Sequence, residues 1–203
     1  RAVTLRHVFL ARHGETDWNA AGRWQGHADV PLNETGRAQA RALADRLRRE
    51  GVAAVATSDL ARARATAEIV AAALGLEVSL VDPDLREQRF GRFEGLTAAE
   101  CEARYPEDWV VRADPRLAPP DGETREAFLA RLLPAVARAA ERLAAPPLIV
   151  THGGAMRVLL DRLAASGAPP VVPASGRILN GSVLRVSLAA GVPVAAAWLE
   201  LAR

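Results

Sequence analysis

The sequence has no lysine, a single cysteine and few aromatic residues. With no second cysteine to pair with, Cys101 cannot form an internal disulfide, which favours a reducing, cytoplasmic setting and a passive thiol. A nucleic-acid interface would combine a basic stripe with interleaved aromatic side chains. Here the arginines are interspersed with acidic residues and the net charge is only +2. We therefore expect no nucleic-acid partner.

Long apolar runs are also missing. No run approaches the roughly 18 residues that cross a bilayer, and no charged-then-apolar signal segment opens the sequence. We therefore expect a soluble, cytoplasmic protein with no membrane partner, although the start at Arg1 leaves open whether a leader was removed. A chain of 203 residues can bury a sizeable core without metal or disulfide cross-links. One domain over residues 1–203 is expected.

Short apolar runs alternate with stretches of helical periodicity along most of the chain. This order predicts an α/β fold of three layers, in which a mostly parallel central sheet lies between two layers of helices. Residues 182–188 and 194–199 alternate in the manner of two edge strands. Between residues 86 and 121 the pattern is irregular, with only a short helix near 97–104, and this predicts a lid-like segment at about 88–122. The other expected strands are 7–11, 52–56, 77–81 and 148–151, and the other helices are 35–50, 60–74, 123–144 and 153–163.

Two histidines follow apolar strands directly. His13 comes after the run 8–11 and His152 after the run 148–151, and each is followed by glycine. In open α/β sheets, ligands bind at the carboxyl ends of the strands. The arginine beside His13 indicates an oxyanion as the ligand, and free N–H groups at the start of the helix after Gly153 would add anion-binding capacity. A phosphate group is therefore the expected ligand.

A second arginine is expected in the same crevice. The segment 58–67 follows the second strand, and Ser58 or Asp59 is expected to cap the helix that begins there. The first turn would then carry Arg62 towards the strand ends. Arginine keeps its charge and forms bidentate hydrogen bonds, which suits a phosphoryl group whose oxygens must be neutralised during transfer.

Several motifs follow one another along nearly the whole chain: Arg12–Thr16 with Trp18 and Asn19, Arg23–Gly26, Pro31–Gly36, Ser58–Ala67, Leu85–Glu87 with Phe90–Gly95, and Thr151–Gly154. In their order and spacing these motifs resemble the histidine phosphatase superfamily, and within it the small phosphatases of the phosphoglycerate mutase-like branch. The resemblance implies a phosphoglycerate mutase-like fold.

The resemblance also implies a role for each site residue. His13 would be the phosphorylated nucleophile, and Glu87 would donate a proton to the leaving oxygen. The phosphoryl group would be held by Arg12, Arg62 and His152. Neither a metal nor a cofactor is implied. The pocket would be completed by Asn19 and by the backbone near Gln25, Gly26 and Gly153.

Other polar residues are less strongly indicated as members of the site. Glu15 is the alternative general acid, although its position next to the arginine favours a role in orienting the pocket. His27 follows the loop at 23–26 and is either a substrate contact or an exposed loop residue. His7 alternates with apolar strand residues and is expected to be structural, and Trp24 is expected to pack a loop.

The substrate is the least determined feature. Phosphoglycerate mutases of this branch carry a longer insertion after the position of Gly95, with basic residues that enclose the intermediate. Here that stretch is short and free of lysine, although Arg104, Arg112 and Arg116 could replace those contacts. A shorter lid should admit water, which hydrolyses a phosphohistidine. We therefore expect a phosphomonoester hydrolase acting on a small phosphorylated metabolite. The alternatives are a mutase-type phosphoryl transfer or a noncatalytic phosphate-binding module, and a homodimer is left open.

Overall fold

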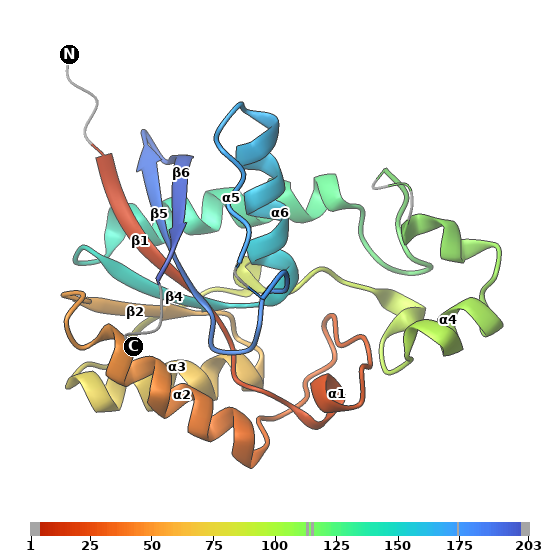
Figure 1. The fold of residues 1–203 in the computed structure, drawn as a ribbon, viewed down its shortest axis with the longest axis horizontal. Coiled ribbons are helices and arrows are strands. Elements are labelled where there is room, and N and C mark those ends of the chain that lie inside the picture. The colour runs from red at the N-terminus through yellow and green to blue at the C-terminus, as the bar shows by residue number, and fades with distance from the viewer. Residues whose placement is uncertain (1–4, 113, 115, 174, 200–203) are drawn as a thin grey trace.

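One sheet of six strands organises the described part of the chain, which comprises residues 5–112, 114, 116–173 and 175–199. The computed structural model orders the strands β3-β2-β4-β1-β5-β6 (Figure 1). Strands β3, β2, β4 and β1 pair in parallel, whereas β5 runs antiparallel to β1 and β6 antiparallel to β5. The expected α/β fold with a mostly parallel sheet is confirmed. The strands are β1 (Leu5–Arg12), β2 (Ala54–Thr57), β3 (Val78–Val81), β4 (Pro147–Thr151), β5 (Val183–Ala189) and β6 (Val192–Trp198).

Two layers of helices cover the sheet (Figure 1). Successive side chains of a strand point to opposite faces, and β1 shows this directly. Phe9 and Ala11 pack into the cluster that contains α2 and α3, whereas Val8 and Leu10 pack into the cluster that contains α5 and α6. Both faces of β1 are therefore buried, as its continuous apolar run predicts. The helices are α1 (Asp17–Ala20), α2 (Glu34–Leu47), α3 (Ala61–Leu74), α4 (Ala98–Arg104), α5 (Arg125–Arg142) and α6 (Gly153–Ala165).

The pattern that predicts two edge strands near the carboxyl end is half right. Only β6 lies at an edge, because β5 is inserted between β1 and β6. Leu184, Val186 and Leu188 are buried, whereas Arg185 between them is exposed. The alternation therefore reflects one buried and one exposed face of β5, and not an edge position.

The start of α3 differs from the expected cap. Its N-cap is Leu60, which makes no side-chain cap hydrogen bond. Ser58 Oγ accepts from the Leu60 N–H at 3.4 Å but lies closer, at 3.0 Å, to Nε2 of His152. Asp59 binds the Arg86 guanidinium through two hydrogen bonds of 2.7 and 2.6 Å. Neither residue is the N-cap of α3, and both side chains contact residues from distant segments.

The lid-like segment forms short helices on one side of the sheet (Figure 1). It contains α4 and two 3-10 helices, η2 (Gly91–Phe93) and η3 (Asp108–Arg112), and a third, η1 (Pro83–Leu85), precedes it. Trp24 packs edge-on against Phe90 at 4.5 Å and against Trp109 at 6.3 Å between ring centroids. The expectation that Trp24 packs a loop is confirmed, and the aromatic contact ties this segment to the loop after α1.

No helix among the described residues is long and apolar enough to cross a bilayer. The lone Cys101 lies on α4 with its side chain buried, and burial raises the pKa of its thiol. A protonated, buried thiol is a poor nucleophile, which agrees with the passive role expected for this residue.

Candidate active site

His13 and His152 follow neighbouring strands, and their rings lie close together. β1 and β4 pair with Arg12 opposite Thr151, so the next residue on each strand is a histidine. The His13 N–H continues the ladder by donating to the Thr151 carbonyl at 2.9 Å. The ring centroids are 5.1 Å apart in an edge-to-face arrangement. The pairing of two central strands therefore sets the separation of the two imidazoles.

The His13 ring is buried in its neutral form, with Nε2 unprotonated. Burial, and then the charges of Arg62 and Arg12, hold the pKa of His13 well below its ordinary value. Nδ1 lies 2.6 Å from the Gly14 carbonyl, which can only accept, so the single proton of the neutral ring is assigned to Nδ1. Nε2 then keeps its lone pair. This is the form of imidazole that can attack an electrophile.

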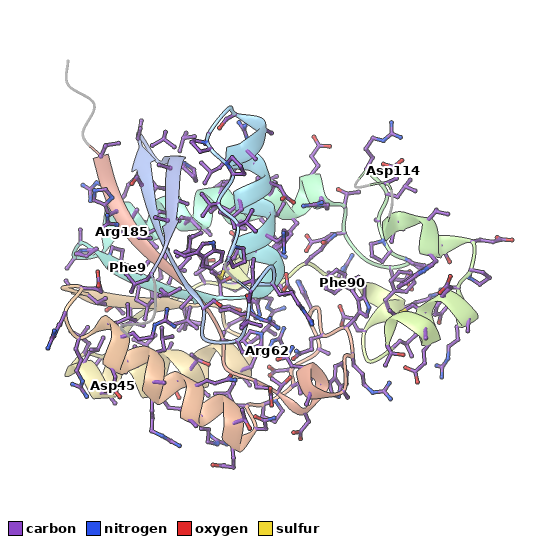
Figure 2. The ribbon with its side chains drawn as sticks, in the orientation of Figure 1. Phe9, Asp45, Arg62, Phe90, Asp114 and Arg185 are labelled. Carbon is purple, nitrogen blue, oxygen red and sulfur yellow. The ribbon has the colours of Figure 1, made fainter. Side chains whose placement is uncertain are left out.

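Arg62 is a fully buried cation at the start of α3. Its side chain lies at the centre of the molecule (Figure 2), where Nη2 donates to the Gly26 carbonyl at 2.8 Å and Nη1 to the Ala28 carbonyl at 2.7 Å. Burial lowers its pKa to about 10, so the guanidinium stays charged at neutral pH. Nε has no partner among the described residues. One donor of this buried cation is therefore free for a ligand.

Arg12 and His152 each have a buried side-chain nitrogen with no hydrogen-bond partner among the described residues. Arg12 Nη1 donates to the Ile178 carbonyl at 2.6 Å, while its buried Nε has no partner in the described structure. His152 uses Nε2 to contact Ser58, and its Nδ1 is likewise buried and unpartnered there. Burial, and then the charge of Arg62, holds the pKa of His152 well below its ordinary value. Burying a polar atom without a hydrogen bond costs folding free energy. Three such atoms near His13 therefore indicate a binding site for an anion with several acceptor oxygens.

The Glu87 carboxylate is fixed at the edge of this pocket. Its Oε2 accepts from the Gly154 N–H and its Oε1 from the Gln88 N–H, both at 2.8 Å. Behind it, the Glu87 carbonyl accepts from Arg131 Nη2 at 2.6 Å and lies 2.9 Å from His27 Nε2. His27 therefore contacts the backbone of Glu87. The Gly154 N–H, which the sequence suggested as a free anion donor, is already engaged by Glu87.

The loop after β1 brings the remaining predicted pocket residues together. The Thr16 hydroxyl donates to Gln25 Oε1 at 3.1 Å, and Asn19 Oδ1 accepts from Asn180 Nδ2 at 3.2 Å. Asn180 also donates to the His13 carbonyl at 3.0 Å. Gly26 has φ of +52°, a left-handed conformation that favours glycine, and it directs its carbonyl to the buried arginine.

Arg131 and Asn180 were not found by sequence reasoning. Arg131 lies on the long helix α5, where its pattern is that of an ordinary exposed helical arginine, yet it reaches the carbonyls of Asp84, Arg86 and Glu87. Asn180 stands before glycine and has the signature of a turn residue. Neither position carries a sequence signal for its contacts with the site.

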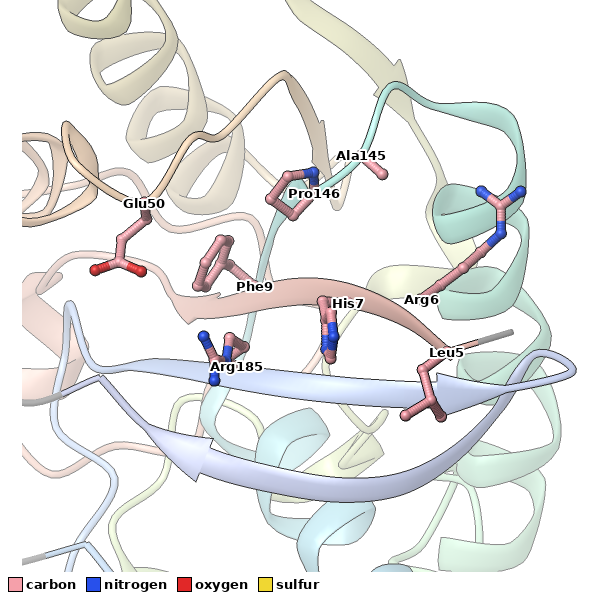
Figure 3. A pocket seen from close by; sticks show the side chains of 8 residues that line it. All are labelled: Leu5, Arg6, His7, Phe9, Glu50, Ala145, Pro146 and Arg185. Carbon is pink, nitrogen blue, oxygen red and sulfur yellow. The ribbon is translucent and has the colours of Figure 1, made fainter. Parts of the chain in front are cut away.

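Glu15 and His7 lie in other surroundings. Glu15 Oε1 accepts from Asn33 Nδ2 at 3.0 Å, at the N-cap of α2. His7 Nδ1 lies 3.0 Å from Ser187 Oγ, on the first half of β1. A separate cavity of about 400 Å³ opens there, away from the end of β1 that carries His13 (Figure 3).

A second cavity, of about 520 Å³, lies directly beside the histidine pocket. The predicted residues Arg12, Glu87 and Gly153 line it, and an added Cβ on Gly153 would lie 3.2 Å from Arg12 Nε. Two further arginines in its lining, Arg157 and Arg177, have no motif signal in the sequence. The rest of the lining is Trp24, Gly154 and Ile178.

Arg104 and Arg116, two of the arginines that the sequence analysis considered in the lid, do not line this cavity. Arg116 pairs with Asp114 at 2.7 Å, and Arg104 is exposed on α4. The side chain of Arg112 lies outside the described residues. Among the described residues, the positive charge at the cavity comes instead from β1, α6 and the segment before β5, so Arg104 and Arg116 do not replace the basic contacts of a mutase at this cavity. The described residues also contain no group of three or more His, Cys, Asp or Glu side chains that could hold a metal ion.

Comparison with known proteins gives a consistent result. Residues 8–200 match the family model of the histidine phosphatase superfamily (branch 1). The chain is 38% identical over 186 residues to phosphoglycerate mutase-like protein 4 of Arabidopsis thaliana, covering 89% of this chain and 79% of that protein. It is 36% identical over 198 residues to "Probable phosphoglycerate mutase GpmB" of Photorhabdus laumondii, covering 95% and 89%. The fold matches a mycobacterial glucosyl-3-phosphoglycerate phosphatase solved with VO3, with a TM-score of 0.77, 32% identity and coverage of 95% and 96%.

Proposed function

Because the chain belongs to the histidine phosphatase superfamily, we propose that it is a phosphatase that hydrolyses a small phosphomonoester through a phosphohistidine at His13. The observation that carries this proposal is a neutral, buried imidazole surrounded by unpartnered polar atoms of Arg12, Arg62 and His152. These groups can hold the phosphoryl oxygens and neutralise their charge without a metal ion. Neither a metal nor a cofactor is part of the proposal.

In the first step, Nε2 of His13 attacks phosphorus while the bond from phosphorus to the ester oxygen breaks. Glu87 enters this step protonated, having taken up a proton from solvent or from the bound phosphate monoanion, and donates it to the departing alcohol oxygen, so the products are an alcohol and a phosphohistidine. Glu87 is the proposed acid because its carboxylate lines the cavity where the leaving group would lie. Glu15 is the weaker candidate, since Asn33 at the start of α2 occupies its carboxylate.

In the second step, water attacks the phosphohistidine. The Glu87 carboxylate, left without its proton by the first step, removes a proton from that water. The phosphorus–nitrogen bond breaks, His13 recovers its lone pair and inorganic phosphate leaves. Asn19, Gln25, Gly26 and Gly153 are proposed to complete the pocket, as side-chain or backbone contacts. We propose that residues 1–203 act as one domain, with 88–122 beside the cavity as a lid.

A mutase reaction is the second candidate, because the two curated relatives carry phosphoglycerate mutase in their names. It would form the same phosphohistidine, but the phosphoryl group would then pass to a hydroxyl of the bound metabolite instead of to water. The short lid favours water as the acceptor. A coupled mutase assay beside a phosphate-release assay, on one panel of phosphorylated metabolites, separates the two reactions.

The covalent intermediate provides the direct test. Mixing with substrate followed by an alkaline quench should leave an acid-labile phosphate on His13, and His13→Asn should lower turnover at least about a thousandfold. His7→Gln is the matched control, because it removes an exposed histidine of the same strand. Turnover that disappears with a chelator and returns with magnesium or zinc would contradict the metal-free mechanism, and near-normal turnover of His13→Asn would place the nucleophile elsewhere.

A further inference from the structure

The ion pair between Arg131 and Glu123 lies against the main chain of Glu87, and neither partner is among the residues that line the cavity. Both side chains are largely buried, with 19% and 15% of their surface exposed. Arg131 Nε and Nη2 donate to the two carboxylate oxygens of Glu123, at 3.1 and 2.5 Å. Nη1 donates to the carbonyls of Asp84 and Arg86, both at 2.9 Å, and Nη2 donates also to the Glu87 carbonyl at 2.6 Å. These contacts use all five N–H donors of the guanidinium.

The carbonyls that Arg131 binds lie where the chain has little regular structure. Asp84 belongs to the short η1, and residues 86–90 form no helix or strand. Backbone groups outside a ladder need other partners, and here a side chain from a long helix supplies them. The guanidinium is itself held in place on α5, because it lies over the Phe128 ring at 4.7 Å from its centroid. Helix α5 therefore sets the path of the main chain at Glu87.

Glu123 fastens the next two residues of the same segment. Its Oε1 also accepts from the Arg89 N–H, and its carbonyl accepts from Gln88 Nε2, both at 2.8 Å. The Gln88 N–H in turn donates to the Glu87 carboxylate, which accepts on its other oxygen from the Gly154 N–H. The ion pair therefore fixes the backbone on both sides of the proposed acid.

We propose that Arg131, paired with Glu123, is a positioning residue for the proton transfer by Glu87. This inference rests on the proposed function and names a further residue of that same site. Arg131 does not line the cavity, so its effect should be confined to the step that needs the Glu87 proton. A group displaced by about 1 Å from its productive position can lose about a hundredfold in rate. The loss of Arg131 should therefore be large, but smaller than the loss of the carboxyl group itself.

Two kinds of substrate separate proton transfer from phosphate binding. An alkyl leaving group needs the proton, whereas the p-nitrophenolate group does not. In Arg131→Gln, we expect the ratio of kcat for the best alkyl phosphate of the metabolite panel to kcat for p-nitrophenyl phosphate to fall about ten- to a hundredfold. Inhibition by vanadate should stay within about twofold of wild type, because the phosphoryl pocket keeps both its arginines.

Two further variants test whether geometry, and not charge or stability, is responsible. Arg131→Lys keeps the charge but offers three donors in a different arrangement, so it should not restore the ratio. Arg138→Gln is the matched control on the same helix, because Arg138 pairs with the side chains of Asp82 and Asp84, at 2.8 and 2.7 Å. It should leave the ratio unchanged. Because the ratio compares two substrates in one protein, a general folding defect cancels.

A double-mutant cycle tests whether Arg131 acts through Glu87. In the Glu87→Gln background, Arg131→Gln should lower the ratio no further, since the residue that it positions has no proton to give. The inference would be overturned by a wild-type ratio in Arg131→Gln, by its recovery in Arg131→Lys, or by an equal further fall in the Glu87→Gln background.

Amide hydrogen exchange separates this inference from the proposed function. If the wild-type protein hydrolyses neither the panel of phosphorylated metabolites nor p-nitrophenyl phosphate, the proposed function fails. The positioning is then judged by the amides of Gln88 and Gly154, which donate to the Glu87 carboxylate. They should exchange at least about tenfold faster in Arg131→Gln but at the wild-type rate in Arg138→Gln. Wild-type exchange of both amides in Arg131→Gln would show that Arg131 does not position Glu87.

Discussion

Lowering the pH below 6.5 should destabilise the fold because His13 and His152 are buried without charge. Burial holds the pKa of both imidazoles well below the ordinary value. In the unfolded chain both histidines titrate near about 6.5. Between the folded and unfolded pKa values the unfolded state binds more protons, so the free energy of unfolding falls as the pH falls. This stability is fully present above about pH 6.5 and is lost below it.

The expected magnitude follows from linkage. One histidine that stays neutral in the folded state contributes a slope of at most about 1.4 kcal/mol per pH unit, so the two give at most about 2.8 kcal/mol per unit. His27, whose pKa is lowered by partial burial and then by Arg131, adds a smaller part. Asp59 and Glu123 have lowered pKa values, the former mainly through Arg86 and the latter through Arg131 despite burial. The stability that these two carboxylates contribute to the fold is lost only below about pH 4.5, which lies below the pH range measured for the histidines.

Denaturant unfolding at intervals between pH 7.5 and pH 5, in phosphate-free buffer, measures this slope. The double variant His13→Asn, His152→Asn should reduce it to the part left by His27, whereas the exposed-residue control His7→Gln should keep the wild-type slope. A free energy of unfolding that stays constant in the wild-type protein between pH 6.5 and pH 5 would refute the claim that both imidazoles are buried in neutral form.

Three further predictions test the individual roles. Glu87→Gln should slow hydrolysis of an alkyl phosphate about 10²- to 10⁴-fold but spare p-nitrophenyl phosphate far more, because the aryl leaving group needs no proton; equal losses in phosphoenzyme formation would exclude Glu87 as the acid. Arg62→Ala should weaken inhibition by phosphate or vanadate as well as turnover, since this charge serves both the ground and transition states; unchanged inhibition would place Arg62 outside the pocket. Gly154→Ala should slow alkyl phosphate hydrolysis at least about tenfold, because an added Cβ would collide with the Glu87 carboxylate, and alkyl turnover equal to wild type would show that this carboxylate needs no fixed position.

The parts of the fold that could be predicted are those set by local pattern. The apolar runs before His13 and His152 gave their strands, and helical spacing gave α3 and α5 with small errors at the ends. The two histidines could be placed together because parallel strands deliver their carboxyl ends to one edge of a sheet. Their roles, and those of Arg12, Arg62 and Glu87, stay predictions until the variants are measured.

The parts that could not be predicted depend on contacts between distant segments. Neither Ser58 nor Asp59 is the N-cap of α3, and a histidine and an arginine from other segments contact those side chains. Arg157 and Arg177 lie 20 positions apart, and only the folded chain shows that both face one cavity. Spacing along one helix or strand is visible in a sequence, whereas convergence of segments is not.

The pairing of β1 with β4 places the proposed catalytic histidines at the ends of two buried central strands. His13 and His152 extend a parallel ladder whose strands are buried on both faces, so their relative position cannot change unless those hydrogen bonds open. Amides of such central strands exchange only through global unfolding in most proteins, while peripheral segments open more easily. Heat should therefore abolish phosphoenzyme formation and strand structure in the same transition. Segments outside this ladder, such as the one that brings Arg177 and Ile178 to the cavity, can vary without changing the relative position of the two histidines.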